Sequence, residues 1–220
     1  LEERKIIKPL FLTDQGVVEH GVFNKIRDVL PSGVNFALFS EIPENPTIKG
    51  IERALEIYKE HKCDGIVALG GGSVLDSGKA LRVVVTQGGD VIDYLKDPNR
   101  IGPNVAPYIT IPTTAGTGAE ITFGGGIHPE TNAPPMSIRS PHVQPDLAIC
   151  DPELTMSLPP RLTAATGMDA VTHCVEGYLS INANAPAEAI ALDGIHRALS
   201  YIDRAVRDGS DREARYNMSM

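Results

Sequence analysis

Short apolar segments alternate with amphipathic helical patterns through the first two thirds of the chain, and this alternation limits the possible folds more than any other feature. Four short, continuous apolar runs are predicted as buried strands: 9–13, 35–39, 65–69 and 107–111. Between them, apolar residues recur every three or four positions, which predicts helices over 17–30, 47–62 and 73–86. This order predicts an α/β fold, with a parallel sheet covered by helices on both faces. In such sheets ligands bind beyond the carboxyl ends of the strands.

The character of the chain changes near residue 157. Residues 124–145 are rich in Gly, Pro and turn formers and predict short antiparallel strands, followed by a last strand over 144–150. Prolines punctuate segment 151–160, and only helical patterns follow, at 163–179, 185–206 and from 211 onward. We therefore expect an α/β domain over 1–157 and the beginning of a helical domain over 158–220. The chain starts without Met and ends without a helix-ending signal, so we expect a piece of a longer protein.

Charge and cysteine content exclude several classes of partner. The formal net charge is −8, which argues against non-specific binding to nucleic acid or to acidic membranes. No run of about 18 apolar residues predicts a membrane span. Three widely spaced cysteines, Cys63, Cys150 and Cys174, indicate reduced thiols in a cytoplasmic protein.

A glycine-rich segment, 70–73, joins the third predicted strand to the following helix. Glycines let a phosphate approach the backbone, and a helix N-terminus offers free N–H groups. The dinucleotide pattern GxGxxG would need a glycine where Leu75 stands, and a P-loop would need Ser or Thr where Ala80 stands. The segment is therefore a diphosphate loop of another kind or simply a tight turn.

Two further polar features follow predicted strands. Segment 112–120 (PTTAGTGAE) stacks hydroxyls that could bond a cofactor. Taken alone, an ordinary Thr-rich helix cap explains it better, but two such loops at adjacent strand ends favour a nucleotide. Asp14 ends the first strand, where an acidic side chain can accept from both ribose hydroxyls and would repel a 2′-phosphate. A turn or helix-capping Asp is the alternative.

Asp169 and His173 are four residues apart on a predicted helix, so their side chains lie one above the other. A carboxylate and an imidazole at this spacing can bind one divalent ion, but two ligands make only half a site. The alternative is a capping Asp beside a packed or solvated His.

Taken in order, these segments resemble the iron-containing (group III) alcohol dehydrogenase family. The matching stretches are 12–14, 44–47, 70–73 with Asp76 and Lys79, 111–120, 151–160 and 165–180. The runs PTTAGTG and GMDAVTHCVEGY are specific to the family. The resemblance implies a Rossmann-like domain that binds NAD(P), followed by an all-helical metal-binding domain, with both ends of the family pattern truncated here.

The resemblance also implies a set of cofactor contacts. Asp14 would face the adenosine ribose, which favours NAD over NADP, and Asn45 would line the cofactor site. The other implied contacts are Gly71, Gly72, Ser73, Val74 and Leu75 around the pyrophosphate, Thr113, Thr114, Thr117 and Thr122 toward the nicotinamide, and Leu154. Many members have a Lys near the position of Pro135, so one cofactor contact is expected to be missing.

For catalysis, the resemblance makes Asp169 and His173 the first two ligands of an Fe²⁺ or Zn²⁺ ion, with two further His beyond the chain end. The implied function is an oxidoreductase that moves hydride between a small alcohol or aldehyde and NAD(H). The resemblance also implies a homo-oligomer. Two alternatives stay open. One is a glycerol dehydrogenase or dehydroquinate synthase-like member of the same superfamily, and the other is a catalytically incomplete nucleotide-binding fragment.

Overall fold

The computed structural model describes all residues from 1 to 220 and divides them into two compact units. The first, called here the sheet unit, contains Leu1–Pro112 and Ala119–Ile149. The second, called the helical unit, contains Cys150–Met220 together with the short segment Thr113–Gly118. The chain thus enters the helical unit twice, first for six residues and then for its whole remaining length.

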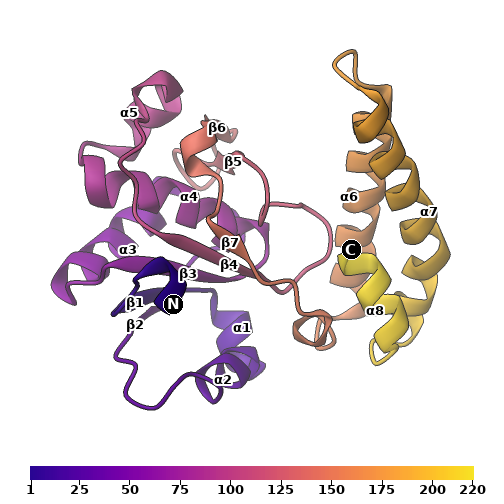
Figure 1. The fold of residues 1–220 in the computed structure, drawn as a ribbon, viewed down its shortest axis with the longest axis horizontal. Helices are drawn as coiled ribbons and strands as arrows, with labels where there is room; N and C mark the ends of the chain where they lie inside the picture. Colours follow the sequence, from indigo (N-terminus) through magenta and orange to yellow (C-terminus); the bar gives the residue numbers. More distant parts are fainter. The chain divides into compact units, whose positions relative to one another are not determined.

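The sheet unit is built on five parallel strands in the order β2-β1-β3-β4-β7 (Figure 1). Their bounds are β1 Pro9–Leu12, β2 Ala37–Phe39, β3 Gly65–Gly70, β4 Tyr108–Pro112 and β7 Leu147–Ala148. The predicted parallel α/β sheet is confirmed. The last strand is shorter than predicted, and before it the backbone carbonyl of Gln144 accepts from the Arg82 side chain instead of a neighbouring strand.

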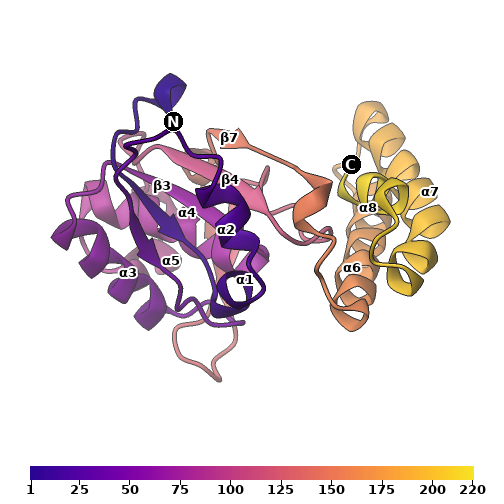
Figure 2. The same ribbon diagram turned by 90° about the horizontal axis from the view of Figure 1, so that it is seen from below.

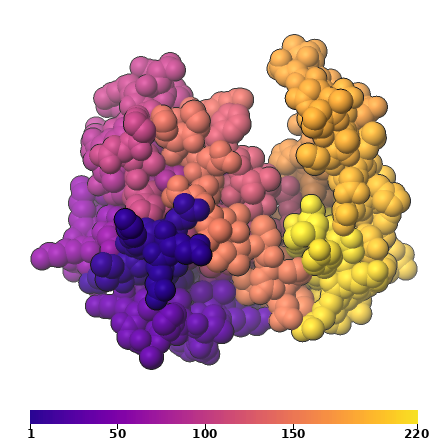
Figure 3. All heavy atoms as spheres, viewed as in Figure 1, coloured from indigo at the N-terminus to yellow at the C-terminus, as the bar shows by residue number.

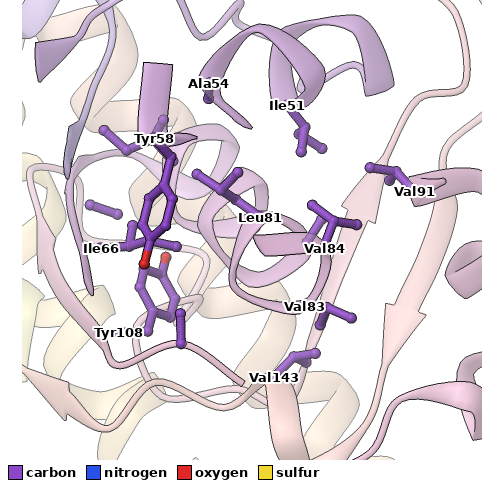
Figure 4. Close-up of a cluster of buried hydrophobic side chains, with 14 of the residues drawn as sticks. Ile51, Ala54, Tyr58, Ile66, Leu81, Val83, Val84, Val91, Tyr108 and Val143 are labelled. Carbon is purple, nitrogen blue, oxygen red and sulfur yellow. The ribbon is translucent and has the colours of Figure 1, made fainter. Parts of the chain in front are cut away.

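Side chains alternate between the two faces of this sheet, and each face has its own helical cover (Figures 1 and 2). Leu10, Ile66 and Tyr108 face the main core, which also contains residues of α3 (Ile48–Glu60) and α4 (Gly72–Gln87). Figure 4 shows Tyr58 from α3 and Leu81 from α4 in this cluster. Phe11 points to the opposite face, where its ring packs edge-on against Phe23 and Phe36.

The helix predicted over 17–30 is wrong in one respect, because two short helices occupy it. Helix α1 spans Gln15–Glu19 and α2 spans Val22–Arg27. Gly21 separates them with a φ of 73°, a left-handed conformation that interrupts a helix and that glycine adopts readily. Helix α5 (Val91–Lys96) was not predicted, since six residues are too few to establish a period. Thr47 caps α3, because its hydroxyl accepts from the Gly50 amide at 3.2 Å.

A two-stranded antiparallel hairpin, β5 (Gly124–Ile127) and β6 (Met136–Arg139), follows the main strands and packs beside α4. It confirms the short antiparallel strands predicted in this region. Short 3₁₀ helices, η1 (Glu2–Arg4), η2 (Pro98–Arg100) and η3 (Pro141–Val143), complete the unit. The N-terminal residues, indigo in Figure 3, lie on the surface, where the Arg4 guanidinium donates to the carbonyl oxygen of Asp146 at 2.6 Å.

The helical unit consists of the 3₁₀ turn η4 (Pro152–Leu154) and three α-helices that match the predicted ones: α6 Pro160–Leu179, α7 Ala185–Arg207 and α8 Arg212–Ser219. The buried Arg215 links α8 to the start of α6 by donating to the Thr163 hydroxyl at 2.9 Å and to the Leu158 carbonyl at 3.2 Å. No helix in the structure combines the length and apolarity that crossing a membrane requires.

The close packing of α4 on the sheet gives a first testable prediction. A Cβ atom at Gly78 would lie 2.4 Å from the hydroxyl oxygen of Tyr108, whose fully buried ring is fixed by a 2.6 Å hydrogen bond to the Leu75 carbonyl. We expect Gly78→Ala to lower the free energy of unfolding by about 1–3 kcal/mol, measured by denaturant titration.

Gly177→Ala is the matched control, because it makes the same change inside exposed helix α6, where a Cβ meets no atom within 4 Å. It should stabilise the chain by about 0.5–1 kcal/mol. Equal effects of the two substitutions would contradict the packing argument.

Candidate functional site

The carboxyl ends of β1, β2 and β3 meet at one edge of the sheet, because these strands are parallel neighbours. Thr13 joins them: its amide donates to the Phe39 carbonyl at 2.9 Å and its hydroxyl to the Leu69 carbonyl at 2.6 Å. The predicted contacts Asp14, Asn45 and Gly71 follow these three strands. The structure therefore brings together the three segments that sequence reasoning had assigned to a cofactor.

The glycine-rich segment forms the start of α4, with Gly71 as the residue before the first helical turn. Gly70 is required there, since a Cβ atom would lie 2.6 Å from Val74. The amides of Gly72 and Ser73 have no acceptor within the chain, and no side chain caps the helix. Unpaired amides at the positive end of a 16-residue helix are suited to a phosphate group.

The hydroxyl of Ser73 donates to the carbonyl oxygen of Glu44. This bond ties the start of α4 to the loop after β2, next to exposed Asn45. Val74 and Leu75 are buried in the core, so only their backbone can face a ligand. Any phosphate contact from this segment therefore comes through the main chain.

Asp14 is half-exposed and caps α1, accepting from the Val17 amide at 2.9 Å through one carboxylate oxygen. Its other oxygen has no hydrogen bond within the chain. The geometry is compatible with Asp14 both as a helix cap and as a ribose contact, because one oxygen caps α1 while the other remains available to a ligand.

Beneath the start of α4 lies a buried ion pair. The Lys79 ammonium is fully buried and lies 3.0 Å from Asp76, 2.9 Å from the Thr122 hydroxyl and 2.6 Å from the Gly124 carbonyl. Burial lowers the pKa of Lys79 and raises the pKa of Asp76, and the attraction between the two opposes both shifts. The hydroxyl of Thr122, a predicted cofactor contact, also donates to the Gly124 carbonyl at 3.2 Å, so a ligand would have to compete for it.

The hydroxyl-rich segment after β4 belongs to the helical unit. A Cβ atom at Gly116 would lie 2.5 Å from the carbonyl oxygen of Thr166, so glycine allows the segment to pack directly on α6. Gly118 has a φ of 62°, in the left-handed region. Of the residues predicted to contact the cofactor here, Thr113 and Leu154 are buried, whereas Thr114 and Thr117 are partly exposed.

Asp169 and His173 lie on α6, with the carboxylate Oδ1 3.6 Å from the imidazole Nε2 and both side chains nearly half exposed. The pair has the geometry of two neighbouring ligands, but no group of three or more metal-ligating side chains exists in the chain. The residues present therefore fit half of a metal site. Cys174 follows His173 in α6, but its Sγ packs at the Gly194 position of α7.

The sequence did not predict that the side chains of Lys79 and Arg82 are buried. Both cations are buried within α4, although lysine and arginine normally remain exposed. The spacing of Lys79 and Arg82 from Asp76, and from the later loops that they bond, follows no period that would predict these contacts. Only the fold shows which carbonyl and carboxylate oxygens surround them.

Fold and site together define the class: an α/β protein with an open parallel sheet and an unpaired helix N-terminus at its carboxyl edge, followed by a helical unit. The model of the iron-containing alcohol dehydrogenases matches residues 1–152, and the C-terminal model of the same family matches residues 163–220. The chain belongs to the iron-containing alcohol dehydrogenase family. The resemblance found in the sequence is thereby confirmed.

Curated relatives agree with this assignment. The chain is 44% identical to 4-hydroxybutyrate dehydrogenase of Cupriavidus necator over 216 residues, which cover 97% of the chain and 56% of the relative. It is 39% identical to choline dehydrogenase of Bacillus subtilis over 217 residues, which cover 97% of the chain and 54% of the relative. The chain therefore spans about half the length of the curated relatives it matches.

Solved structures give the same result. A 1,3-propanediol oxidoreductase superposes with a TM-score of 0.94 at 33% identity, over 99% of this chain and 57% of that chain. Sulfoacetaldehyde reductase from Bifidobacterium kashiwanohense, solved in complex with NAD⁺, has a TM-score of 0.93 at 29% identity, over 99% of this chain and 58% of that chain. The α/β fold with a following helical part is thus the fold of the family.

The incomplete ligand set predicts weak metal binding by these 220 residues. Protein-bound zinc usually has three or four protein ligands, whereas this chain offers a carboxylate and an imidazole. We expect calorimetric titration with Zn²⁺ to show weak binding that an equimolar chelator abolishes and that His173→Ala reduces further.

His196→Ala is the control, because His196 is an exposed histidine of α7 outside the pair. One tightly held equivalent of zinc that resists the chelator would contradict the two-ligand interpretation.

Proposed function

We propose that this chain is the cofactor-binding part, with the first metal-ligand helix, of an NAD-dependent oxidoreductase that interconverts a small alcohol and its aldehyde. The observation that carries the proposal is the pair of unpaired amides, Gly72 and Ser73, beside Asp14 at the carboxyl edge of the sheet. Family membership and the NAD⁺ complex of a similar structure support this assignment.

In this proposal, the sheet edge binds the dinucleotide. The amides of Gly72 and Ser73 donate to the diphosphate, and the positive end of α4 favours its negative charge. The unpaired oxygen of Asp14 accepts from the adenosine ribose hydroxyls, and its negative charge disfavours the 2′-phosphate of NADP. The loop carrying Asn45 is held against the start of α4 by the bond between Ser73 and Glu44.

The helical unit carries the candidate metal ligands. Asp169 and His173 would hold a divalent ion, Fe²⁺ or Zn²⁺, which when bound lowers the pKa of an alcohol so that hydride can leave for nicotinamide. Thr113, Thr114 and Thr117 present hydroxyls in the segment that packs on the same helix, α6. The cofactor carries the hydride chemistry, and these residues orient it.

The substrate class follows from the relatives' names, which include dehydrogenases of 4-hydroxybutyrate, choline and 1,3-propanediol. These compounds share a primary alcohol on a short chain, so we assign a substrate of this kind. A nucleotide-binding module without catalysis is the second candidate, and the two-ligand metal pair is the observation in its favour. We also propose a cytoplasmic homo-oligomer, with the domain boundary at residues 157–158.

Asp14 allows a test that separates cofactor choice from folding. In a fluorescence titration, the wild-type chain should bind NADH more tightly than NADPH. Asp14→Ser retains a helix-capping oxygen and removes the charge, so we expect it to narrow or reverse this preference with little loss of stability. Asp14→Ala is the control that removes both the capping oxygen and the charge, at a cost of about 0.5–2 kcal/mol in the free energy of unfolding. An unchanged preference in the Ser variant would contradict the role of Asp14.

His173 tests the catalytic half of the proposal. In the longest natural polypeptide that contains these residues, we expect His173→Ala to abolish alcohol oxidation while NADH affinity stays within about twofold, because the imidazole touches the metal and not the dinucleotide. His196→Ala should leave both unchanged. Turnover that persists in the His173 variant would contradict the metal assignment.

A further inference from the structure

Lys79 is the only lysine of the chain with a fully buried side chain, and the proposed function does not use it. Its ammonium has three N–H groups, and three oxygen atoms accept them: Asp76 Oδ1, Thr122 Oγ1 and the Gly124 carbonyl, at 2.6–3.0 Å. A cation that is buried and fully bonded cannot also contact a cofactor. Any role of Lys79 in the site is therefore indirect.

The partners of Lys79 come from two separate elements. Asp76 lies in the first turns of α4, whereas Gly124 begins β5 and Thr122 lies two residues before it. Asp76 strengthens the link with its second oxygen, which accepts from the Gly126 amide at 3.0 Å. A Cβ atom at Gly125 would lie 2.6 Å from the Asp76 carboxyl carbon, so glycine is needed for this approach. We call these contacts between Asp76, Lys79 and residues 122–126 the α4–β5 clamp.

The clamp lies directly behind the proposed diphosphate site. Asp76 is four residues after Gly72 and three after Ser73, so all three lie on one side of the first helical turns. Rotation or fraying of this turn would redirect the two unpaired amides. The clamp opposes such movement by fixing Asp76 to the hairpin.

We infer that Lys79 is a positioning residue of the cofactor site: by holding Asp76 against β5, it fixes the direction of the Gly72 and Ser73 amides. The inference rests on the proposed cofactor function. Without the ammonium, the largely buried carboxylate of Asp76 would lose its compensating cation, and so would Glu120, which also interacts with Lys79. The first turn of α4 would then have to open toward water.

Arg82 provides a matched control on the same helix. It is equally buried, pairs with Asp146 at 3.0 Å, and donates to the carbonyls of Ala106 and Gln144. These partners precede β4 and β7, so Arg82 ties α4 to the opposite, amino edge of the sheet. Its loss should destabilise the chain as the loss of Lys79 does, without disturbing the start of α4.

The test compares Lys79→Met with Arg82→Met in the 220-residue chain, by NADH titration and by hydrogen exchange. We expect the dissociation constant for NADH to rise about tenfold or more for Lys79→Met and to stay within about twofold for Arg82→Met. Amide exchange should increase over 122–127 and 72–76 only in the Lys79 variant. Equal effects of the two substitutions on affinity, or unchanged exchange at the hairpin, would overturn the inference.

Two further variants separate positioning from charge neutralisation. Asp76→Asn weakens the clamp at nearly constant side-chain volume, so it should raise the dissociation constant even where Lys79→Met does not fold. The double variant Asp76→Asn with Lys79→Met removes the uncompensated carboxylate but does not restore the clamp. It should regain stability while its affinity stays low, and full recovery of affinity would overturn the inference.

The outcomes also distinguish this inference from the proposed function. A wild-type chain that binds no NADH contradicts the proposed function and the positioning role that rests on it. A wild-type chain that binds NADH, with unchanged affinity in Lys79→Met, contradicts the positioning role alone.

Discussion

The burial of α4 between the sheet and the hairpin is the constraint on which the sheet unit depends. This helix packs against β3, β4 and β5, and most of its residues are inaccessible to solvent. Its closeness to the sheet requires glycine at position 78, opposite the Tyr108 ring. Two cations, Lys79 and Arg82, are buried with it, and each is matched by a carboxylate and by carbonyl oxygens. Breaking either pair would leave an uncompensated buried charge, which is strongly destabilising.

This arrangement explains why the first turn of α4 can remain unpaired. A helix N-terminus without a capping side chain normally loses stability, because its first amides have no acceptor. Here the helix is held from its sides by core packing and by buried ion pairs, and Gly71 leaves the end open. The amides can therefore be reserved for a ligand at little cost to the fold.

Much of the fold could be predicted because strand and helix periods are local properties of the sequence. The strands near residues 9–12 and 65–70 are short apolar runs, and Thr47 has the recognisable form of a helix cap. The break at Gly21 was missed because apolar spacing continues across it, and only the left-handed backbone reveals the interruption. The bonds from Arg82 to Gln144 and Asp146, beside the last strand, join residues more than 60 positions apart, so no local pattern predicts them.

The candidate site, like the fold, could be predicted from the sequence only in part. Asp14 and the glycine segment could be selected from their positions after strands, and the structure places both at one edge. The spacing of Asp169 and His173 likewise follows from helical geometry. The hydrogen-bond partners of individual side chains could not be predicted. One example is the Glu44 carbonyl, which accepts from the Ser73 hydroxyl. These partners come from loops that meet only in the folded chain.

The packing of Gly116 on Thr166 has a consequence for dissecting the molecule. Segment Thr113–Gly118 belongs to the helical unit although it lies within the sequence of the sheet unit. A fragment cut before Cys150 would retain α6, α7 and α8 but lack the six residues that cover one side of α6. The helical unit is therefore not a contiguous module: excised by a single cut, it would expose the backbone at Thr166, one turn before Asp169.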